Sequence, residues 1–462
     1  MFSIPAKQLL RRNLPVSASQ FCRGFRSYHE VSYQRTARDP KEVLSYRADP
    51  LIDDLDGNQK DESYNNEWVR VEMMHAPWNP ADVNTVQGRY PSPYGSSKVV
   101  SSSDGNLRVA SKHCIGRYFD KDPVIGSEGW GTVTHSSSSL IPEGTLVTMG
   151  LPGLGTLRSS LWVPVSAVLP VPGFVKDQLG SSGSSLFQLG GTALRLLSDF
   201  VTLQPGDVVL QNAGNSGVGF LASQLAASPS LFGKNQNETN GNSIDECSTP
   251  LMVSMIRRHG KSKKSFDETV DYLTSVGKNT FVIAEEDLFI PADDTDGNSE
   301  GRKINETAIR EMRQKLRDLS PIGKLPKLAL NAVGGETAKA MLKLLEPGST
   351  MVTYGGMSGK GIELATPQLI FSDVRMVGYW HSRWMVRQHR YEQENQTSIS
   401  QRSAMIDTLS KLVRDEDLKC PPAKVVRLED LQDGLLWQED QQSKGSSTQS
   451  PVKTKLIWDC SA

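Results

Sequence analysis

The sequence predicts an α/β protein with two domains, one built on a doubly wound parallel sheet and the other rich in β-strands. Between about residues 191 and 383, buried apolar runs alternate with helical patterns, which is typical of a parallel sheet covered by helices. Upstream of this region, short strand-like runs are separated by Gly and Pro, which indicates an all-β body. A chain of 462 residues is also too long for one ordinary core.

Composition places the chain among globular proteins and gives no sign of a nucleic-acid or membrane partner. The hydrophobic fraction is 37%, the charged fraction is 22% and the formal net charge is -1. No apolar run is long enough to span a bilayer. The five cysteines form no CxxC pair and no Cys/His cluster with metal-ligand spacing. We therefore expect free thiols in a reducing compartment and no bound metal.

The first thirty residues differ from the rest of the chain. They contain serines, apolar residues and five basic residues, and the first acid is Glu30. This composition is typical of a mitochondrial transit peptide, so we expect residues 1–30 to direct the chain to the matrix. Plastid targeting and a basic tail without an address are the alternatives. The polar residues 31–66 are expected to be a processing remnant and a leading loop.

The β-rich part is expected to begin at about residue 66. Residues 68–78 alternate apolar and polar side chains, which predicts a half-buried strand ended by Pro77 and Pro80. The Ser- and Lys-rich residues 95–122 resemble an inserted loop. Short strands are expected after it, at 131–134, 146–149 and 161–168.

The alternating part begins with a helix predicted at 191–200. The expected strands are 207–211, 250–256, 280–284, 327–333 and 350–356, with helices at 220–227, 267–276 and 336–345. Polar insertions in surface loops are expected at 229–249, 287–306 and 438–452. After residue 380 the alternation stops, and the chain continues to a helix at 403–414 and a terminal strand. If that strand returns to the first domain, the domain consists of 66–190 and 384–462, and 191–383 forms the second domain.

A glycine-rich turn follows the first strand of the alternating part. The segment NAGNSGVG occupies residues 212–219, between a predicted strand and a predicted helix. Glycines let the backbone approach a pyrophosphate, and the helix N-terminus offers free N–H groups and the positive end of its dipole. The literal GxGxxG pattern is absent, but the context predicts a dinucleotide site. A glycine-rich turn that binds nothing is the alternative.

Basic residues follow the second strand of this part. Arg257, Arg258 and His259 come directly after PLMVSMI, and three lysines follow at 261, 263 and 264. A site for NAD usually places an acid here, on the ribose hydroxyls, whereas a basic cluster suits a 2′-phosphate. The cluster predicts NADPH as the cofactor, and a solvated basic loop is the alternative.

Longer motifs are similar to those of a known family. QPGDVVLQNAGNSGVG, with LGGTALRLL upstream, resembles the medium-chain dehydrogenase/reductase superfamily. VEMMHAPWNPADVNTVQGRYP resembles the N-terminal signature of the mitochondrial trans-2-enoyl-CoA (enoyl-[acyl-carrier-protein]) reductases. GSEGWGTV, GLGTLRSS, LALNAVGG, TMVTYGGMSG and FSDVRMVGYWHSRW follow in the family's order, and together the motifs cover about residues 66–460. The resemblance implies a GroES-like catalytic domain, a Rossmann-like NADPH-binding domain and an active cleft between them.

The resemblance also implies an activity and a set of site residues. The implied activity is the zinc-free, NADPH-dependent reduction of trans-2-enoyl thioesters in mitochondrial fatty-acid synthesis. The acyl group is carried on acyl-carrier protein or coenzyme A, and the enzyme is a homodimer. The catalytic acid falls on Tyr90 of QGRY, with Tyr94 as a second candidate. Cofactor contacts fall on Asn215, Ser216, Gly217, Val218, Arg257, Arg258, His259, Tyr354, Gly355, Gly356, Met357, Tyr379, Trp380, His381, Ser382 and Lys455, with Lys453 open because the register near the C-terminus is ambiguous.

Some residues depart from the family's pattern. Leu189 and Gly190 stand where Asn-Pro is common, Leu157 stands where an aromatic residue is common, and Trp78 replaces a smaller apolar residue. These differences leave the preferred acyl length open. Two other functions also remain open. An NADPH quinone oxidoreductase of the same superfamily would not need the Tyr90 hydroxyl, and a catalytically silent NADPH-binding protein would need no acid.

Overall fold

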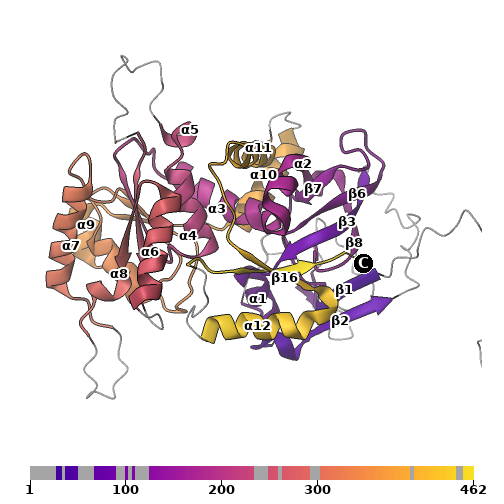
Figure 1. Ribbon diagram of the computed structural model, residues 1–462, viewed down its shortest axis with the longest axis horizontal. Coiled ribbons are helices and arrows are strands. Elements are labelled where there is room, and N and C mark those ends of the chain that lie inside the picture. Colours follow the sequence, from indigo (N-terminus) through magenta and orange to yellow (C-terminus); the bar gives the residue numbers. More distant parts are fainter. Residues whose placement is uncertain are drawn as a thin grey trace, which may run out of the picture.

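In the computed structural model the described residues build two large β-sheets that lie side by side (Figure 1), together with two two-stranded ones. The structure describes residues 28–33, 37–49, 67–89, 99–101, 107–109, 124–233, 248–258, 263–291, 302–395, 400–443 and 451–461. Within this part of the chain no helix is both long and apolar enough to cross a membrane.

The first sheet has six parallel strands. Their spatial order is β12 (Thr280–Ala284), β11 (Leu251–Ile256), β10 (Val208–Gln211), β13 (Leu328–Asn331), β14 (Thr350–Thr353) and β15 (Arg375–Gly378). The strand order reverses between β10 and β13, as in a doubly wound dinucleotide-binding sheet. A ligand is therefore expected to bind beyond the carboxyl ends of these two strands.

Helices cover both faces of this sheet. Val209 of β10 packs in one core with Phe220 and Leu273, whereas Val208 and Leu210 pack in a second core on the other face. Because successive side chains of a strand point to opposite faces, a strand covered on both sides must be apolar throughout, and β10, β11 and β13 are fully buried. The helices of this part are α3 (Leu186–Ser198), α4 (Gly217–Ala226), α5 (Pro229–Phe232), α6 (Lys263–Gly277), α7 (Glu306–Leu319), α8 (Gly335–Lys343) and α9 (Thr366–Ser372).

The second sheet joins the two ends of the chain. Its strands are β16 (Ala423–Arg427), β17 (Lys455–Asp459), β3 (Trp68–Pro77), β6 (Trp130–Ser136), β7 (Leu146–Met149) and β9 (Val168–Pro170), and β8 (Ser160–Pro164) pairs with β3. The terminal strand β17 lies antiparallel to β3, with Trp458 opposite Ala76, and Figure 1 shows the yellow C-terminal strand beside the indigo strand. Residues far apart in sequence thus form one sheet.

Short helices surround this second sheet and connect it to the first. They are α1 (Pro80–Val86), α2 (Gly173–Leu179), α10 (His381–Asn395), α11 (Gln401–Arg414) and α12 (Leu431–Ser443). Helix α11 packs against α3 and α2, and its Arg402 donates hydrogen bonds to the carbonyls of Gly150 and Ser166. The buried Arg402 also pairs with Glu392 of α10 at 2.5 Å. This buried ion pair fixes α10 and α11 over the junction of the two sheets.

A short hairpin, β4 (Val99–Ser101) with β5 (Leu107–Val109), falls in the stretch expected to be an inserted loop.

The N-terminal region corrects one expectation. Residues 31–66 were predicted to be a leading loop, but β1 (Tyr28–Tyr33) and β2 (Leu44–Asp49) form an antiparallel hairpin. Val31 of this hairpin is fully buried in the core of the second sheet, and its N–H donates to the carbonyl of Leu157. The prediction missed the hairpin because its strands carry many polar residues, two of which, Glu30 and Ser32, are buried all the same.

Candidate functional site

The glycine-rich turn lies at the carboxyl end of β10, where the sheet's strand order reverses. Ser216 caps α4, with its Oγ accepting the N–H of Gly219 at 3.2 Å. A Cβ at Gly214 would lie 2.8 Å from Ser254 of β11, and one at Gly219 would lie 2.6 Å from the carbonyl oxygen of Ala213. Glycine is therefore required at both positions, and the turn presents bare backbone in front of the α4 N-terminus. Asn215, Ser216, Gly217 and Val218 all lie on this turn or in the first residues of the helix, as predicted for a pyrophosphate site.

Buried polar side chains support the turn from below. The Gln211 amide donates to the carbonyl of Gly219 and to the hydroxyls of Ser223 and Ser254, at 2.7–3.0 Å. The Asn212 amide donates to Asn331 Oδ1 at 2.8 Å, which joins the ends of β10 and β13. Gln211 and Asn331 were not predicted from the sequence to be part of the site. Each of the two is a polar residue at the end of a buried apolar strand, and this pattern could have identified them.

The segment after β14 forms the wall beside this turn. The N–H of Tyr354 donates to the Asn331 carbonyl at 3.0 Å, and a Cβ at Gly355 would lie 2.8 Å from the Ala332 carbonyl oxygen. Burial raises the pKa of Tyr354 far above its usual range, so its hydroxyl stays protonated. Open space surrounds the position of a Gly356 Cβ, and Met357 is largely exposed. These four residues, predicted to contact a cofactor, therefore lie at the carboxyl edge of the sheet beside the glycine-rich turn.

The basic end of β11 is paired with acids from the neighbouring strand. Arg257 Nε lies 3.1 Å from Glu285 Oε2, and Arg258 makes a two-fold contact with Asp287, one branch of which is 3.1 Å. The backbone N–H of Arg258 donates to Glu286. Both guanidinium side chains remain about half exposed, at 54% and 48%. The two arginines are thus positioned and accessible, but their charge is shared with carboxylates; His259 lies outside the described residues.

Residues 379–382 lead into α10, which begins at His381, and the His381 side chain is buried. The Tyr379 hydroxyl lies 2.8 Å from Nδ1 of His381, and the His381 ring stacks on Trp384 at 5.7 Å between ring centroids. Burial, followed by the charge of Arg195, lowers the pKa of His381 to about 3, so its ring is neutral. His381 therefore orients its neighbours and cannot act as a cationic acid near pH 7. Trp380 lies under the guanidinium of Arg383, 5.2 Å from the ring centroid.

A buried polar network joins the two sheets. Glu128 accepts the Asn79 side-chain amide at 2.9 Å and the backbone N–H of Gln188, at the start of α3, also at 2.9 Å. Lys455 of β17 donates to Asn79 Oδ1. Burial raises the pKa of Glu128 to about 7 and that of Asp82, in the first turn of α1, to about 6. Glu128 was not predicted from the sequence to have a role, although it lies in the GSEG motif.

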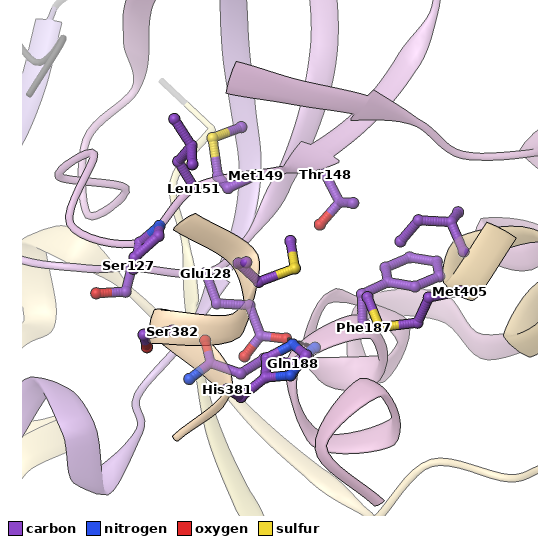
Figure 2. A pocket seen from close by; sticks show the side chains of 13 residues that line it. Ser127, Glu128, Thr148, Met149, Leu151, Phe187, Gln188, His381, Ser382 and Met405 are labelled. Carbon is purple, nitrogen blue, oxygen red and sulfur yellow. Dashed lines mark hydrogen bonds between the residues drawn. The ribbon is translucent and has the colours of Figure 1, made fainter. Parts of the chain in front are cut away.

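An apolar pocket opens beside this network, between the two sheets (Figure 2). Its cavity volume is about 20 Å³, and the pocket is partly open to solvent. Figure 2 shows Glu128, Gln188 and His381 on one side of the space, with Phe187 and Met405 on another. Its walls come from the second sheet, from the start of α3, from α10 and from α11, and its lining is Ser127, Glu128, Thr148, Met149, Leu151, Pro152, Phe187, Gln188, His381, Ser382, Met385, Met405 and Ile406. Such a site suits a flexible apolar chain with a polar head.

Two predicted catalytic candidates lie outside the described residues. These are Tyr90 and Tyr94, whereas α1 and the residues up to Arg89 are described. No group of three or more His, Cys, Asp or Glu residues in the described part of the chain could hold a metal ion.

Comparisons with known proteins agree with this arrangement. No family model matches the chain. It is 31% identical over 370 residues to the mitochondrial enoyl-[acyl-carrier-protein] reductase of Rattus norvegicus, a match that covers 79% of this chain and 76% of the relative.

Solved structures share the fold. The mitochondrial 2-enoyl thioester reductase Etr1p/Etr2p heterodimer from Candida tropicalis matches with a TM-score of 0.65 at 21% identity. A complex of Etr1p with NADP and crotonyl-CoA matches with a TM-score of 0.66 at 20% identity. Each match covers 94% of this chain and 99% of the other. The fold class predicted from the sequence is therefore confirmed.

Proposed function

Because the chain belongs to the family of mitochondrial enoyl-[acyl-carrier-protein] reductases, as its motifs predicted, we propose that it reduces trans-2-enoyl thioesters to acyl thioesters with NADPH. The observation that carries the proposal is the position of the apolar pocket. It lies between the two sheets, and His381 and Ser382 of the predicted cofactor segment form part of its wall. A substrate in this pocket would therefore lie against the cofactor.

The residues at the carboxyl edge of the six-stranded sheet fit a dinucleotide. Gly214 and Gly219 leave no room for a side chain, and Ser216 caps α4 so that the first N–H groups of the helix face outward. When bound, NADPH supplies the hydride that adds to Cβ of the substrate. Asn215 to Val218 would hold the pyrophosphate, Arg257 and Arg258 would face the 2′-phosphate, and Tyr354 to Met357 would form the wall beside the dinucleotide.

The proton for Cα is proposed to come from Tyr90. Addition of hydride at Cβ leaves an enolate, and protonation at Cα gives the saturated thioester, while the tyrosinate recovers its proton from solvent. Helix α1 leads to Arg89, immediately before this residue, and its N-cap Asn79 belongs to the Glu128 network beside the pocket. The network therefore fixes the helix from which the chain continues to Tyr90.

The acyl group is proposed to occupy the apolar side of the pocket. Met149, Met385, Met405 and Phe187 line it, and flexible thioethers adapt to an acyl chain. Arg383 and Arg387 are exposed on α10, the helix that carries His381 and Met385. Their cations suit the phosphates of either phosphopantetheine carrier, acyl-carrier protein or coenzyme A.

The proposed setting is mitochondrial fatty-acid synthesis in the matrix. The names of the relatives and the basic composition of residues 1–30 both support it.

A homodimer is proposed through the edge of the six-stranded sheet. Among the described strands, β15 pairs only with β14, so its outer edge is free. Beside it, Ile370 and Phe371 of α9 are 66% and 80% exposed, and Val377 of β15 is also exposed. An exposed edge strand beside apolar side chains suits pairing with a second copy. Phe371→Asp should give a monomer in sedimentation-velocity runs, and a wild-type chain that sediments as a monomer would contradict the proposal.

The decisive experiment for the function measures NADPH oxidation with crotonyl-CoA and, separately, with a quinone. Turnover of crotonyl-CoA that depends on Tyr90 supports the reductase. Turnover of the quinone alone, unaffected by Tyr90→Phe, would identify a quinone oxidoreductase instead. Binding of NADPH without either turnover would identify a silent NADPH-binding protein.

A further inference from the structure

The His381 ring is held at one nitrogen and free at the other. Its Nδ1 lies 2.8 Å from the Tyr379 hydroxyl, and the ring stacks on Trp384 with 12° between the two ring planes. Within the described residues Nε2 has no hydrogen-bond partner, although His381 is only 8% exposed. His381 lines the apolar pocket, and Figure 2 shows it on the same side of the space as Glu128. A buried ring nitrogen without a partner in a pocket wall is available to a ligand.

A glycine makes room for this edge of the ring. A Cβ at Gly191 of α3 would lie 3.1 Å from Nε2 and 2.9 Å from Cε1 of His381. It would also lie 2.6 Å from Sδ of Met405, which lines the apolar side of the same pocket. A side chain at position 191 would therefore displace the imidazole or the thioether. The Nε2 edge of the ring thus lies where the polar wall of the pocket meets the apolar wall.

The Tyr379 hydroxyl determines which ring nitrogen carries the proton. Burial raises the pKa of Tyr379, so the hydroxyl keeps its hydrogen, and Nδ1 of His381 is its sole hydrogen-bond partner among the described residues. A buried O–H needs an acceptor, and Nδ1 can accept only when it carries no hydrogen. Burial and then the charge of Arg195 lower the pKa of His381 to about 3, so the ring holds a single proton. That proton lies on Nε2, which becomes an N–H donor beside the pocket.

The other polar groups of the wall are either engaged or less firmly held. Both carboxylate oxygens of Glu128 accept hydrogen bonds, and the Thr148 hydroxyl donates to a backbone carbonyl at 3.1 Å. The side chains of Gln188 and Ser382 form no hydrogen bond within the described part of the chain, and they are the rival donors. Both are only half-buried, whereas His381 is fixed by a ring stack and by a hydroxyl. A donor that is already held in place stabilises developing charge most effectively.

We propose that the Nε2–H of His381 donates a hydrogen bond to the carbonyl oxygen of the enoyl thioester, with the acyl chain running along Met405. Addition of hydride at Cβ moves an electron pair onto this oxygen, and a neutral N–H stabilises the resulting enolate without giving up its own proton. The electron pair returns when Cα takes its proton from Tyr90. The inference rests on the proposed function and makes His381 a catalytic residue that contacts the substrate.

The test compares two substitutions of His381 in the full chain. His381→Leu removes the donor, whereas the amide of His381→Gln places an N–H near the position of Nε2. His389→Leu is the matched control, because His389 also lies on α10 and bonds Ser166 at 3.2 Å, outside the pocket lining. With crotonyl-CoA, kcat should fall about a hundredfold in His381→Leu, as for the loss of one donor to an oxyanion. The loss should be smaller in His381→Gln and absent in the control, and NADPH affinity should be unchanged in all three.

A second readout does not depend on turnover. Difference infrared spectra are recorded for butyryl-CoA with an isotope-labelled thioester carbonyl, bound to the protein together with NADP. Because a hydrogen bond weakens the C=O bond, the wild type should lower the carbonyl stretching frequency relative to free butyryl-CoA. His381→Leu should return the frequency most of the way to the free value, and His389→Leu should leave it as in the wild type.

Three results would overturn the assignment. Unchanged kcat and an unchanged carbonyl frequency in His381→Leu would show that Nε2 does not contact the thioester. A frequency shift that is kept in His381→Leu and lost in Gln188→Met would place the donor on Gln188. Equal losses of turnover and of NADPH affinity in His381→Leu and His381→Gln would show that the ring only supports the fold. Turnover of crotonyl-CoA by the wild type tests the proposed function separately, so a normal wild type with any of these results sinks only the role of His381.

Discussion

The side-chain amide of Asn79 donates to Glu128 at 2.9 Å, which joins the N-cap of α1 to the wall of the pocket. The second oxygen of Glu128 accepts the backbone N–H of Gln188, and the Asn79 oxygen accepts from Lys455. Asn79 and Gln188 therefore meet at the carboxyl group of Glu128, and Lys455 joins this network through Asn79. The network thus fixes the N-terminus of α1, the helix after which the described part of the chain ends at Arg89.

Stability should depend on the charge of Glu128. Burial raises its pKa to about 7, above its ordinary value of 4.5, so the folded protein binds this proton more tightly than the unfolded chain does. The contribution of Glu128 is then most favourable below pH 4.5 and is lost as the pH rises through about 7. The loss should be on the order of 1–3 kcal/mol. Chemical unfolding of the wild type and of Glu128→Gln between pH 4.5 and 8 measures it.

The difference between the two curves reports Glu128 together with Asp82 and Lys455, whose charges interact with it. Neutral His381 acts in the opposite direction, because its pKa of about 3 destabilises the fold as the pH falls below 6.5. That contribution is present in both proteins and cancels. The stability of Glu128→Gln relative to wild type should therefore improve as the pH rises from 4.5 to 8. A difference that stays constant over this range would mean that Glu128 does not titrate there.

Tyr90→Phe should reduce turnover of an enoyl thioester by about two orders of magnitude or more. The substitution removes only the hydroxyl that is proposed to protonate Cα, and general acid catalysis of this kind contributes about 10²–10⁴-fold. NADPH affinity should hardly change. Tyr94→Phe is the matched control and should retain turnover. Near-normal turnover of Tyr90→Phe, with loss in Tyr94→Phe, would move the role to Tyr94.

Five strands of the six-stranded sheet were predicted, whereas its edge strand β15, which is mostly exposed, and several helices were not. Strands β11, β12 and β14 are short apolar runs because they are covered on both faces, and this pattern is visible without a structure. Helix α10 was missed because only His381, Met385 and Val386 of its fifteen residues are buried. Helix α12 contains Gly434, which the packing of Trp458 requires, since a Cβ there would lie 2.3 Å from that ring. A glycine required by tertiary packing weakens the helical signal.

The candidate site was predictable where backbone geometry dictates sequence. A side chain at position 214 or 219 would clash with neighbouring atoms, so both positions must be glycine. The turn can therefore be recognised as a motif in the sequence. The partners of Arg257 and Arg258 were not predictable, because Glu285 and Asp287 follow a different strand and reach the arginines only through the parallel pairing of β11 with β12. The burial of Glu128 likewise depends on contacts with three distant segments.

The hairpin of β1 and β2 limits how many residues can be removed from the N-terminus without loss of stability. A chain beginning at residue 28 should fold and be active, whereas one beginning at residue 50 should lose stability by about 2–5 kcal/mol. The larger deletion removes Val31, Val43 and Leu44 from the core. It also removes the His29 carbonyl, which accepts the N–H of Ser159, the residue before β8. Thermal unfolding of the two truncations gives the comparison. If both unfold at the wild-type temperature, the hairpin is dispensable.

A reporter test addresses targeting on its own. Residues 1–27 fused to a fluorescent protein should carry it into mitochondria, because the segment is basic and lacks acids. The same fusion with Arg11, Arg12, Arg23 and Arg26 changed to Gln is the control and should remain in the cytosol. Accumulation of the unchanged fusion in plastids or in the cytosol would contradict the proposed address.

Replacing both Arg257 and Arg258 with Ala should lower kcat/KM for NADPH at least tenfold and leave NADH use little changed. Guanidinium groups match a phosphate through paired, charge-assisted hydrogen bonds worth about 1.5–3 kcal/mol each. Both side chains are about half exposed and already contact Glu285 and Asp287, so solvent and the acids reduce the gain, and we expect the lower end of that range. The fold should tolerate the change, because Glu285 keeps its contacts with Arg302 and Thr337.

Asp287→Asn provides the opposite perturbation at the same place. It removes the negative charge that engages the Arg258 guanidinium through both branches, while the amide keeps the size of the side chain. Arg258 is then free to face the 2′-phosphate, so NADPH affinity should rise while NADH affinity stays the same. Opposite shifts in the two variants would identify the arginines as the source of cofactor preference. If the double alanine variant keeps its preference for NADPH and Asp287→Asn does not increase it, the basic end of β11 is a solvated loop and the preference must come from elsewhere in the site.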